Sequence, residues 1–291
     1  MTEGRNSFLL LLLVIFSCNF SQAQYLEYGL GLGQSVYWGD LNTPEFSTNL
    51  SNRKWATQAF LRYNHTEHLS FKVNLLYGKL SGDDRKSNLD WQQLRNLRFE
   101  SHLVEASFLG EYYLFGIDYN AGKKFSPFVT AGMSLFTFNP TTDFQGERID
   151  LQPLGTEGQG LPGYGNKYSK VAFSIPFGAG ARIALNQKLS LNIDIIGRRT
   201  FTDYIDDVSG TDVNYNELLA GNGQLAADLG NRQAEALGQS EPVQLPSGTK
   251  RGGELVRDYF FTFMVSANYY LSSTNLFSKG ARISTSNCPT F

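Results

Sequence analysis

Beyond its N-terminal segment, the chain is dominated by runs in which apolar and polar residues alternate. Alternation with a period of two places successive side chains on opposite faces of a β-strand. Each run is long enough to cross a bilayer as a tilted strand, for which about 9–11 residues suffice. None contains the roughly 20 consecutive apolar residues of a membrane-spanning helix. Eight such runs occur, at about 25–38, 53–66, 67–80, 98–116, 125–139, 169–185, 188–205 and 257–272.

The segments between these runs alternate in length. The connections after the second, fourth and sixth runs are short and read "HTEH", "GIDYNAGKK" and "NQ", whereas the others are long, at about 39–52, 81–97, 140–168 and 206–256. Short periplasmic turns and long extracellular loops are typical of outer-membrane barrels, whereas a soluble β-sandwich has no reason to alternate in this way. The sequence therefore predicts an all-β fold, an eight-stranded antiparallel transmembrane β-barrel over 24–272 in the outer membrane. Both termini are expected to be periplasmic because the strand number is even.

One face of the predicted strands is apolar and the other is polar. In the third run, Val73 and its alternate neighbours are apolar, whereas Lys72 belongs to the opposite, polar face. We expect the apolar face to contact lipid and the polar face to line the lumen. Leu76, Ile196 and Met264 interrupt the polar face, and a lumen tolerates a few such residues. Near the strand ends, an aromatic girdle is expected from Tyr25, Tyr28, Trp38, Trp55, Tyr112 and Tyr113.

Charges of both signs occur on the lumen face, and they bear on whether the barrel is open. Eight strands enclose an interior that side chains can fill, and buried charges have to be paired. We therefore predict a closed barrel held by internal salt bridges, with a small pore as the alternative. Glu105, Asp194 and Arg198 are expected nearer the outer end than the remaining charges. The predicted network comprises Glu27, Arg62, Lys72, Glu105, Glu111, Arg182, Asp194 and Arg198.

The N-terminal segment, residues 1–23, has the layout of a secretory signal peptide. Arg5 precedes the apolar run "FLLLLLVIF", and small residues lead up to Ala23, after which we expect cleavage. The run is too short to span a bilayer as a helix, so a retained anchor is the less favoured alternative. Lipid attachment at Cys18 is disfavoured because "IFSC" is a poor match to a lipobox.

Composition and a glycine motif bear on possible ligands. A net charge of -2 leaves no basic excess for binding nucleic acid. "GQGLPG" at 158–163 has the spacing of a dinucleotide fingerprint, but Pro162 lies inside it and a strand pattern follows it. We therefore assign these glycines to an ordered loop with positive φ angles, which forms either a folded cap or a docking surface. In the last long loop, "NELLAGNGQLAADLGNRQAEALGQ" predicts short helices outside the membrane.

Support for catalysis or metal binding is weak in the sequence, which contains only three histidines. His65 and His68 belong to the first short turn, where His-x-x-His lacks a third ligand. His102 lies near the outer end of its strand, and Asp206 and Asp207 could lie at the same rim. Residues of suitable type at a rim are a weak basis for an active site. We predict no enzymatic activity, no cofactor, no metal site and no small-molecule substrate.

Several stretches of the chain resemble one known family. They are "YWGDLN" (37–42), "FSPFVTAGMSLFTFNP" (125–140), "LQPLGTEGQG" (151–160), "YSKVAFSIPFGAGARIAL" (168–185), "RRTFTDYIDDVSG" (198–210) and a terminal "CPTF" (288–291). Together they resemble the PorG family of outer-membrane barrels of the Bacteroidetes type IX secretion system. The resemblance implies a non-enzymatic component that links a periplasmic lipoprotein ring to the outer membrane. A generic OmpA-like structural barrel or a small passive channel is the alternative.

The region after the last predicted strand, 273–291, supplies a candidate for partner contact. Once Cys18 is removed with the signal peptide, Cys288 is the single thiol, so no internal disulfide is possible. Lys279 and Arg282 make this tail positively charged. We hypothesise that the tail docks on a periplasmic partner of the secretion system and that Cys288 forms an intermolecular disulfide. The alternative is a disordered tail with an idle thiol.

Overall fold

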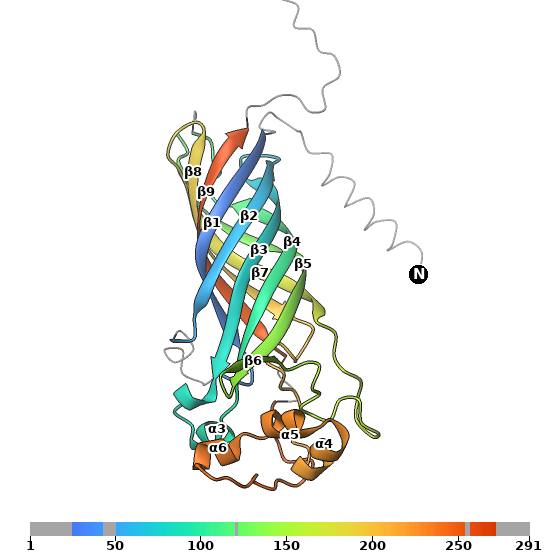
Figure 1. Ribbon diagram of the computed structural model, residues 1–291. Coiled ribbons are helices and arrows are strands. Elements are labelled where there is room, and N and C mark those ends of the chain that lie inside the picture. The colour runs from blue at the N-terminus through green and yellow to red at the C-terminus, as the bar shows by residue number, and fades with distance from the viewer. Residues whose placement is uncertain (1–24, 43–50, 120–121, 254–256, 272–291) are drawn as a thin grey trace, which may run out of the picture.

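Eight strands close into an antiparallel barrel in the computed structural model, which describes residues 25–42, 51–119, 122–253 and 257–271. Each barrel strand pairs with its neighbours in sequence, and β1 pairs with β9, which closes the sheet (Figure 1). The predicted fold is therefore confirmed. The barrel strands are β1 (Tyr25–Trp38), β2 (Lys54–Asn64), β3 (Leu69–Asp83), β4 (Arg98–Tyr113), β5 (Phe125–Phe144), β7 (Val171–Ala184), β8 (Leu189–Thr200) and β9 (Tyr259–Leu271).

The two ends of the barrel differ in the length of their connections. Short segments lie at the end where β1 begins and β9 ends (Figure 1); their described residues are 65–68, 114–119, 122–124 and 185–188. This end is called the short-turn end, and the opposite one is called the long-loop end. The alternation of connection lengths in the sequence thus corresponds to two different ends of one barrel.

Side-chain caps explain how the chain reverses at the short turns. Thr66 Oγ1 accepts hydrogen bonds from the backbone N–H groups of His68 at 3.2 Å and Leu69 at 2.9 Å. Asn186 Oδ1 likewise accepts from the backbone N–H of Leu189 at 2.8 Å. Short polar side chains that bond to the backbone two or three residues on stabilise a tight reversal.

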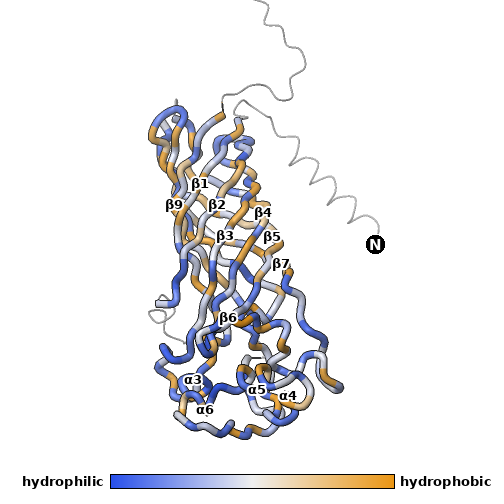
Figure 2. The backbone as a smooth tube through the Cα atoms, in the orientation of Figure 1, coloured by the Kyte–Doolittle hydropathy of each residue, from blue (hydrophilic) through white to orange (hydrophobic). Residues whose placement is uncertain are grey.

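The outside of the barrel is apolar, and the inside is filled by side chains. Val73 is 54% exposed, whereas the preceding Lys72 is 0% exposed, as the alternating pattern predicts. Figure 2 shows hydrophobic colour along the strands and hydrophilic colour around α3 and α6. The outward residues form an apolar belt, which comprises Leu30, Leu32, Leu61, Val73, Leu75, Tyr77, Val104, Phe108, Val129, Met133, Leu135, Ile175, Phe177, Ile193, Ile195 and Val265.

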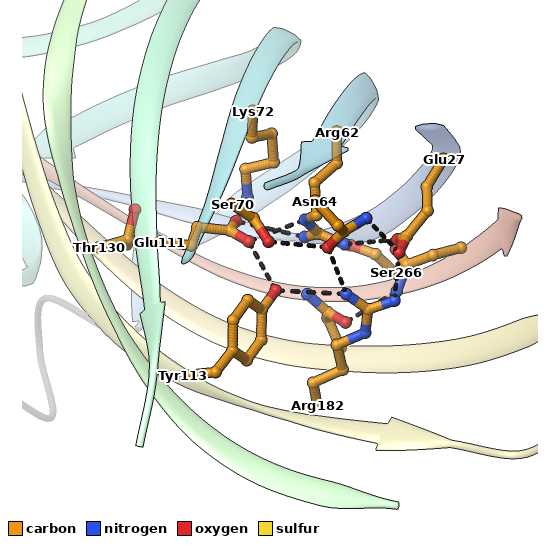
Figure 3. Close-up of polar contacts among 12 residues, drawn as sticks. Glu27, Arg62, Asn64, Ser70, Lys72, Glu111, Tyr113, Thr130, Arg182 and Ser266 are labelled. Atoms are coloured by element: carbon orange, nitrogen blue, oxygen red, sulfur yellow. Dashed lines mark hydrogen bonds and ion pairs between the residues drawn. The ribbon is translucent and has the colours of Figure 1, made fainter. Parts of the chain in front are cut away.

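The predicted aromatic girdle is wrong in two members, Tyr25 and Tyr113. Tyr25 shares the inward face of Glu27 on β1, and its ring centroid lies 4.9 Å from that of Tyr270, which bonds to Arg182. Tyr112 is 50% exposed on the outside, whereas Tyr113 is 1% exposed and points into the lumen (Figure 3). The two residues are consecutive on β4, so their side chains have to lie on opposite faces of the sheet. Tyr28 and Trp55 are exposed on the outer face, as expected.

Helices and a hairpin form a cap over the long-loop end (Figure 1). The expected helices of the last long loop are confirmed as three short ones, and Gly223, with a φ of 92°, separates the first two. The described helices all fall short of the length and apolar character that crossing a membrane requires. The helical elements are η1 (Asp84–Lys86), α3 (Asp90–Arg95), α4 (Tyr215–Gly221), α5 (Gln224–Gly230) and α6 (Gln233–Leu237).

One part of the cap extends directly from the barrel wall. The fifth strand was expected to end near residue 139, but β5 continues to Phe144 and forms a hairpin with β6 (Glu147–Asp150). Pro140 lies inside this extension, and it accepts a hydrogen bond from the backbone N–H of Leu151 at 2.9 Å. Proline ordinarily indicates the end or the edge of a strand, so the sequence did not predict this hairpin.

A hydrophobic core occupies the long-loop half of the lumen and continues into the cap. Leu76 and Met264, which were expected as isolated exceptions on a polar face, belong to this core. Its lumen members form the apolar plug, which comprises Tyr37, Leu76, Leu80, Phe99, Leu103, Phe136, Phe138, Phe260 and Met264. Cap residues that pack on the plug are Leu41, Leu97, Leu151, Ile205, Val208 and Leu229.

Candidate functional site

Five charged side chains meet in the lumen near the short-turn end, and they come from β1, β2, β3, β4 and β7 (Figure 3). Arg62 is central, with Nη1 3.1 Å from Glu27 Oε2 and Nε 2.7 Å from Glu111 Oε2. Lys72 Nζ lies 2.9 Å from Glu111 Oε1, and Arg182 Nη2 lies 2.6 Å from Glu27 Oε1. We call these five residues the lumen ion cluster.

Strand register explains why these charges meet. Glu27 lies opposite Arg62, and Arg62 lies opposite Lys72, so one row of the sheet alternates in sign. Glu111 pairs with Ser70, which places it diagonally from Lys72. Side chains opposite each other on a sheet have Cβ atoms about 4.5–5.5 Å apart, within easy reach of long charged groups. The cluster is therefore a direct consequence of alternation and register.

Neutral side chains complete the hydrogen bonds of the cluster. Asn64 Nδ2 donates to Glu27 Oε1 at 2.6 Å, and the Tyr113 hydroxyl donates to Glu111 Oε2 at 2.7 Å (Figure 3). Ser70 Oγ donates to Asn64 Oδ1 at 2.7 Å. The predicted network omitted these three neutral residues. Each of them occupies one of the alternate strand positions that face the lumen, and this position in the sequence could have identified them.

The other three predicted lumen charges lie farther toward the long-loop end. Arg198 Nε is 3.0 Å from Glu105 Oε2, and both side chains are at most 1% exposed. Asp194 is 2% exposed, and neither of its carboxylate oxygens has a hydrogen-bond partner among the described residues. Contrary to the prediction, Asp194 forms no salt bridge in this part of the chain. The residues opposite it in the register, Gly180 and Met264, carry no charge.

The apolar plug separates the lumen ion cluster from the cap. Leu76 and Phe136 flank Glu105 in one row of the register. The ring centroids of Phe136 and Phe260 are 5.5 Å apart, and the guanidinium of Arg198 lies 5.2 Å from the Phe260 centroid. A polar solute that entered from either end would meet this packed layer. Packed side chains therefore close the described lumen at this level.

Tyr37 connects the plug to the cap. Its hydroxyl lies 2.7 Å from Asp206 Oδ2 and 2.5 Å from Asp258 Oδ1, and it accepts from the backbone N–H of Asp40 at 3.1 Å. A phenol has one proton, so it can donate to only one carboxyl group, and the other has to carry its own proton to bond to it. Burial raises the pKa of both Asp206 and Asp258 well above the usual range. The Asp206–Asp258 pair therefore retains a proton at pH values at which exposed carboxyl groups are ionised.

The glycine motif lies in an ordered loop of the cap. Gly155, Gly158, Gly160 and Gly163 have φ angles of 66°, 81°, 93° and 90°. Residues with a Cβ adopt this region at a cost of about 1–2 kcal/mol, which explains the choice of glycine. A strand, β7, follows the motif. The prediction of an ordered loop is confirmed, and its role as a docking surface stays a prediction.

Buried acidic residues fasten this loop to the neighbouring one. Glu157 Oε1 accepts from the backbone N–H groups of Ser209 at 3.0 Å and Gly210 at 3.3 Å. Thr156 Oγ1 donates to Asp207 Oδ2 at 2.6 Å. Burial raises the pKa of Glu157 to about 7 and the pKa of Asp207 to about 6. These carboxyls therefore titrate near neutral pH, and they lie between two cap loops.

The residues considered for catalysis lie on different sides of the barrel wall. His102 is exposed on the outer face, whereas Asp206 and Asp207 are buried beneath the cap. His68 Nδ1 donates to the carbonyl oxygen of Tyr113 at 2.6 Å and so helps to hold the first turn. In the described part of the chain, no group of three or more His, Cys, Asp or Glu side chains is arranged to hold a metal ion.

The predicted partner-binding residues lie outside the described residues. They are Lys279, Arg282 and Cys288 in the tail at 273–291. The expected signal peptide at 1–23 also lies outside them. Both remain predictions from the sequence.

Solved structures of small outer-membrane barrels are similar to this chain at low sequence identity. Ail, the attachment invasion locus protein of Yersinia pestis, is 8% identical, with a TM-score of 0.41, and the match covers 86% of this chain and 100% of that one. Neisserial surface protein A is also 8% identical, with a TM-score of 0.42, and the match covers 85% and 99%. For the N-terminal β-barrel domain of Pseudomonas aeruginosa OprF, the identity is 10%, the TM-score 0.34 and the coverage 86% and 100%.

Sequence comparison identifies the family. No curated protein matches the chain. One family model does match, and its match spans residues 6–153, which is just over half of the chain. The chain therefore belongs to the family described as "Domain of unknown function (DUF6089)".

Proposed function

We propose that this chain is a non-enzymatic outer-membrane barrel that anchors a periplasmic complex of a type IX secretion system, as its resemblance to the PorG family implies. The observation that carries the proposal is the filled interior. The lumen ion cluster occupies one half and the apolar plug occupies the other. A barrel closed in this way is suited to hold a position in the membrane and to bind partners at its ends. The apolar belt supports insertion into the bilayer.

The orientation in this proposal follows from the two kinds of connection. Short turns face the periplasm in barrels of this type, and long loops face outward. The chain leaves β9 at the short-turn end, so the tail at 273–291 begins on the periplasmic side in this orientation. Lys279, Arg282 and Cys288 are therefore proposed to contact the periplasmic partner, and the cap is proposed to face the cell exterior.

A structural barrel without a partner is the first alternative to this proposal, and a passive channel is the second. The apolar plug disfavours a channel because an ion would have to leave water to cross a layer of leucine and phenylalanine side chains. Single-channel conductance of the purified protein in planar bilayers tests this alternative directly. Stepwise currents at physiological salt would overturn the scaffold proposal in its present form.

The decisive test of the anchor is partner capture from outer membranes. Membranes carrying the tagged protein are solubilised, and the complex is examined on gels with and without reductant. We expect a heavier band that collapses on reduction and is absent in Cys288→Ser. Mass spectrometry of that band should identify a periplasmic secretion component.

A matched pair of variants separates the tail from general charge effects. Lys279→Gln/Arg282→Gln removes two tail cations, whereas Lys124→Gln/Lys188→Gln removes two cations from turns at the same end. Only the tail pair should reduce partner capture. If both variant pairs captured the partner equally and the wild type ran as a single monomer band, the anchoring role would be rejected. The protein would then be a structural barrel without a partner.

A further inference from the structure

We propose that the outer face of the barrel near the long-loop end binds a phosphate group of an acidic membrane lipid. The proposed site centres on Glu100, which is approached by three cations. Lys54 Nζ lies 2.7 Å from Glu100 Oε2, and Lys79 Nζ and Arg148 Nη1 lie 3.0 Å and 2.9 Å from Glu100 Oε1. One further carboxylate, Asp143, approaches Arg148 at 3.4 Å. These contacts leave positive charge in excess on an outward-facing surface.

The site lies at the depth where headgroups meet the barrel. Lys79 on β3 is opposite His102 on β4, and both belong to the outer face. Two residues farther along the same strands, Tyr77 is opposite Val104, and both belong to the apolar belt with exposures of 47% and 50%. Two residues of a strand span about 7 Å, so Lys79 lies directly above the last apolar row. Headgroups occupy this level around a transmembrane barrel.

A small polar cavity adjoins the cluster. Its volume is about 140 Å³, and its lining includes five cations, Lys54, Arg85, Lys86, Arg98 and Arg148, against three carboxylates. Arg98 is also paired with Glu235, outside the lining, at 3.1 Å. The excess of cations in the lining occurs in a chain whose net charge is -2. Pockets for drug-sized molecules span roughly 300–1,000 Å³, so this one suits a compact anionic group. Lysine and arginine are the side chains that proteins use for phosphate, and arginine can bind it through two parallel hydrogen bonds.

The cations are held in place before any ligand binds. Arg148 lies on β6, where it pairs with Asp143 of β5, so the hairpin that extends the barrel wall positions it. Lys86 Nζ donates to the amide oxygen of Asn52 at 2.8 Å, and no carboxylate in the described part of the chain lies within ion-pair distance of it. Side chains that are ordered in advance lose less entropy on binding. A lipid phosphate would share these cations with Glu100.

A lipid is favoured over a soluble anion because of where the site faces. Lys79 and Glu100 lie on the outer face of β3 and β4, next to the apolar belt, whereas Phe99 and Thr142 form the buried side of the cavity. The inference rests on the proposed membrane location of the barrel, but it is independent of the tail and of secretion. Insertion of the refolded protein into lipid vesicles tests that location separately.

The test uses the full mature protein, folded in zwitterionic detergent at about 150 mM salt. Binding of diphosphoryl lipid A is measured by native mass spectrometry for the wild type and for two charge-matched variants. Lys54→Gln/Arg148→Gln removes two cations from the site, and Lys123→Gln/Lys124→Gln removes two from the short-turn end, where Lys123 pairs with Glu67 at 2.6 Å. A cation near an anionic lipid surface contributes about 1 kcal/mol, so the first variant should bind about 30-fold more weakly. The second should bind within about threefold of the wild type, a difference of less than 1 kcal/mol.

Glu100→Gln gives a prediction of the opposite sign. It removes the carboxylate that competes with phosphate for three cations, so lipid binding should become tighter. Heat-modified gel mobility shows whether each variant is folded. Equal weakening in both double variants, or no weakening in either, would overturn the proposal. Complete displacement of the lipid by inorganic phosphate at equal phosphate concentration would also overturn it, because the site would then be one for free anions.

Discussion

The two halves of the barrel interior are filled by different chemistry. Near the short-turn end, directional ion pairs tie five strands together across the lumen. Near the long-loop end, aromatic and aliphatic side chains pack with residues from the cap, as in the core of a soluble domain. The first half therefore stabilises the wall of the barrel alone. The second half stabilises the wall and the cap together, which explains how long loops remain folded outside the strands.

The comparison teaches that the two halves should respond differently to substitution. A charge left without its partner inside the lumen cannot regain water, so the loss of one member is felt by all the others. A methyl group removed from the plug leaves a cavity whose cost depends on how far its neighbours relax. Substitution of any one charged residue near the short-turn end should therefore lower the free energy of unfolding by a similarly large amount. Near the long-loop end, the loss should vary with the size of the cavity that each substitution leaves.

The largest effect is expected for Arg62→Ala in the lumen ion cluster. Arg62 contacts both Glu27 and Glu111 and is 0% exposed, so its removal breaks two buried ion pairs. Each carboxylate is left with one remaining cation, Arg182 or Lys72. Breaking a buried ion pair costs about 3–5 kcal/mol. Urea unfolding in lipid vesicles should show this loss, and Lys123→Ala, in a surface pair, should lose less than about 1 kcal/mol. A similar loss in both variants would show that the lumen cluster adds no special stability.

The next largest effect is expected for Leu103→Ala in the apolar plug. Leu103 is 0% exposed, and truncation of a buried leucine costs about 2–5 kcal/mol. Because the plug also supports the cap, protease cleavage within 206–253 should become faster in this variant. Leu75→Ala, on the lipid-facing side with 59% exposure, provides the control and should leave the cap intact. An unchanged cap in Leu103→Ala would contradict the idea that plug and cap form one unit.

A smaller, pH-dependent effect should be confined to the cap. The folded cap raises the pKa of Glu157 to about 7 and of Asp207 to about 6, so it binds more protons than the opened cap. Its stability is therefore complete below about pH 4 and is lost as pH rises through about 6 to 7. Arg251 lies 3.4 Å from Glu157 and offsets part of this effect.

Hydrogen exchange of the cap measures this dependence. After correction for intrinsic rates, exchange in 206–253 should be on the order of several hundred-fold faster at about pH 8 than at about pH 5, whereas the strands should change little. Asp207→Asn should weaken the dependence, and Asp150→Asn, at an exposed position, should preserve it. Slower hydrogen exchange of the cap at high pH would contradict this prediction, because buried carboxyls with raised pKa values stabilise the cap at low pH.

Strand positions and lumen charges could be predicted because they depend on local alternation. Glu27, Arg62 and Lys72 share a row of the register, and each lies on the polar face of its own strand. The apolar plug could not be predicted in this way, because it forms only when loop residues such as Ile205 and Leu229 fold back over the lumen. Those residues are distant in sequence, and no periodic pattern relates them to the strands.

The hairpin and the cation cluster escaped prediction for a related reason. The fifth run was expected to end at about residue 139, yet β5 continues through Pro140 and the hairpin brings Arg148 to Glu100. Asp194 shows the opposite error, because correct parity placed it in the lumen but could not supply a partner. Parity predicts the face of a residue, whereas pairing depends on the register of the neighbouring strands.

The smallest effect is expected for Gly155→Ala in the glycine loop. A left-handed φ costs a residue with a side chain about 1–2 kcal/mol, and a Cβ at this position would lie 2.5 Å from the carbonyl oxygen of Gln159. Gly163→Ala has a similar φ of 90° but meets no atom within 4 Å, so it reports the backbone cost alone. Cap proteolysis should rank Gly155→Ala above Gly163→Ala, and both above the wild type. The same ranking should disappear when global unfolding of the barrel is measured, because the loop packs on the cap and not on the lumen ion cluster.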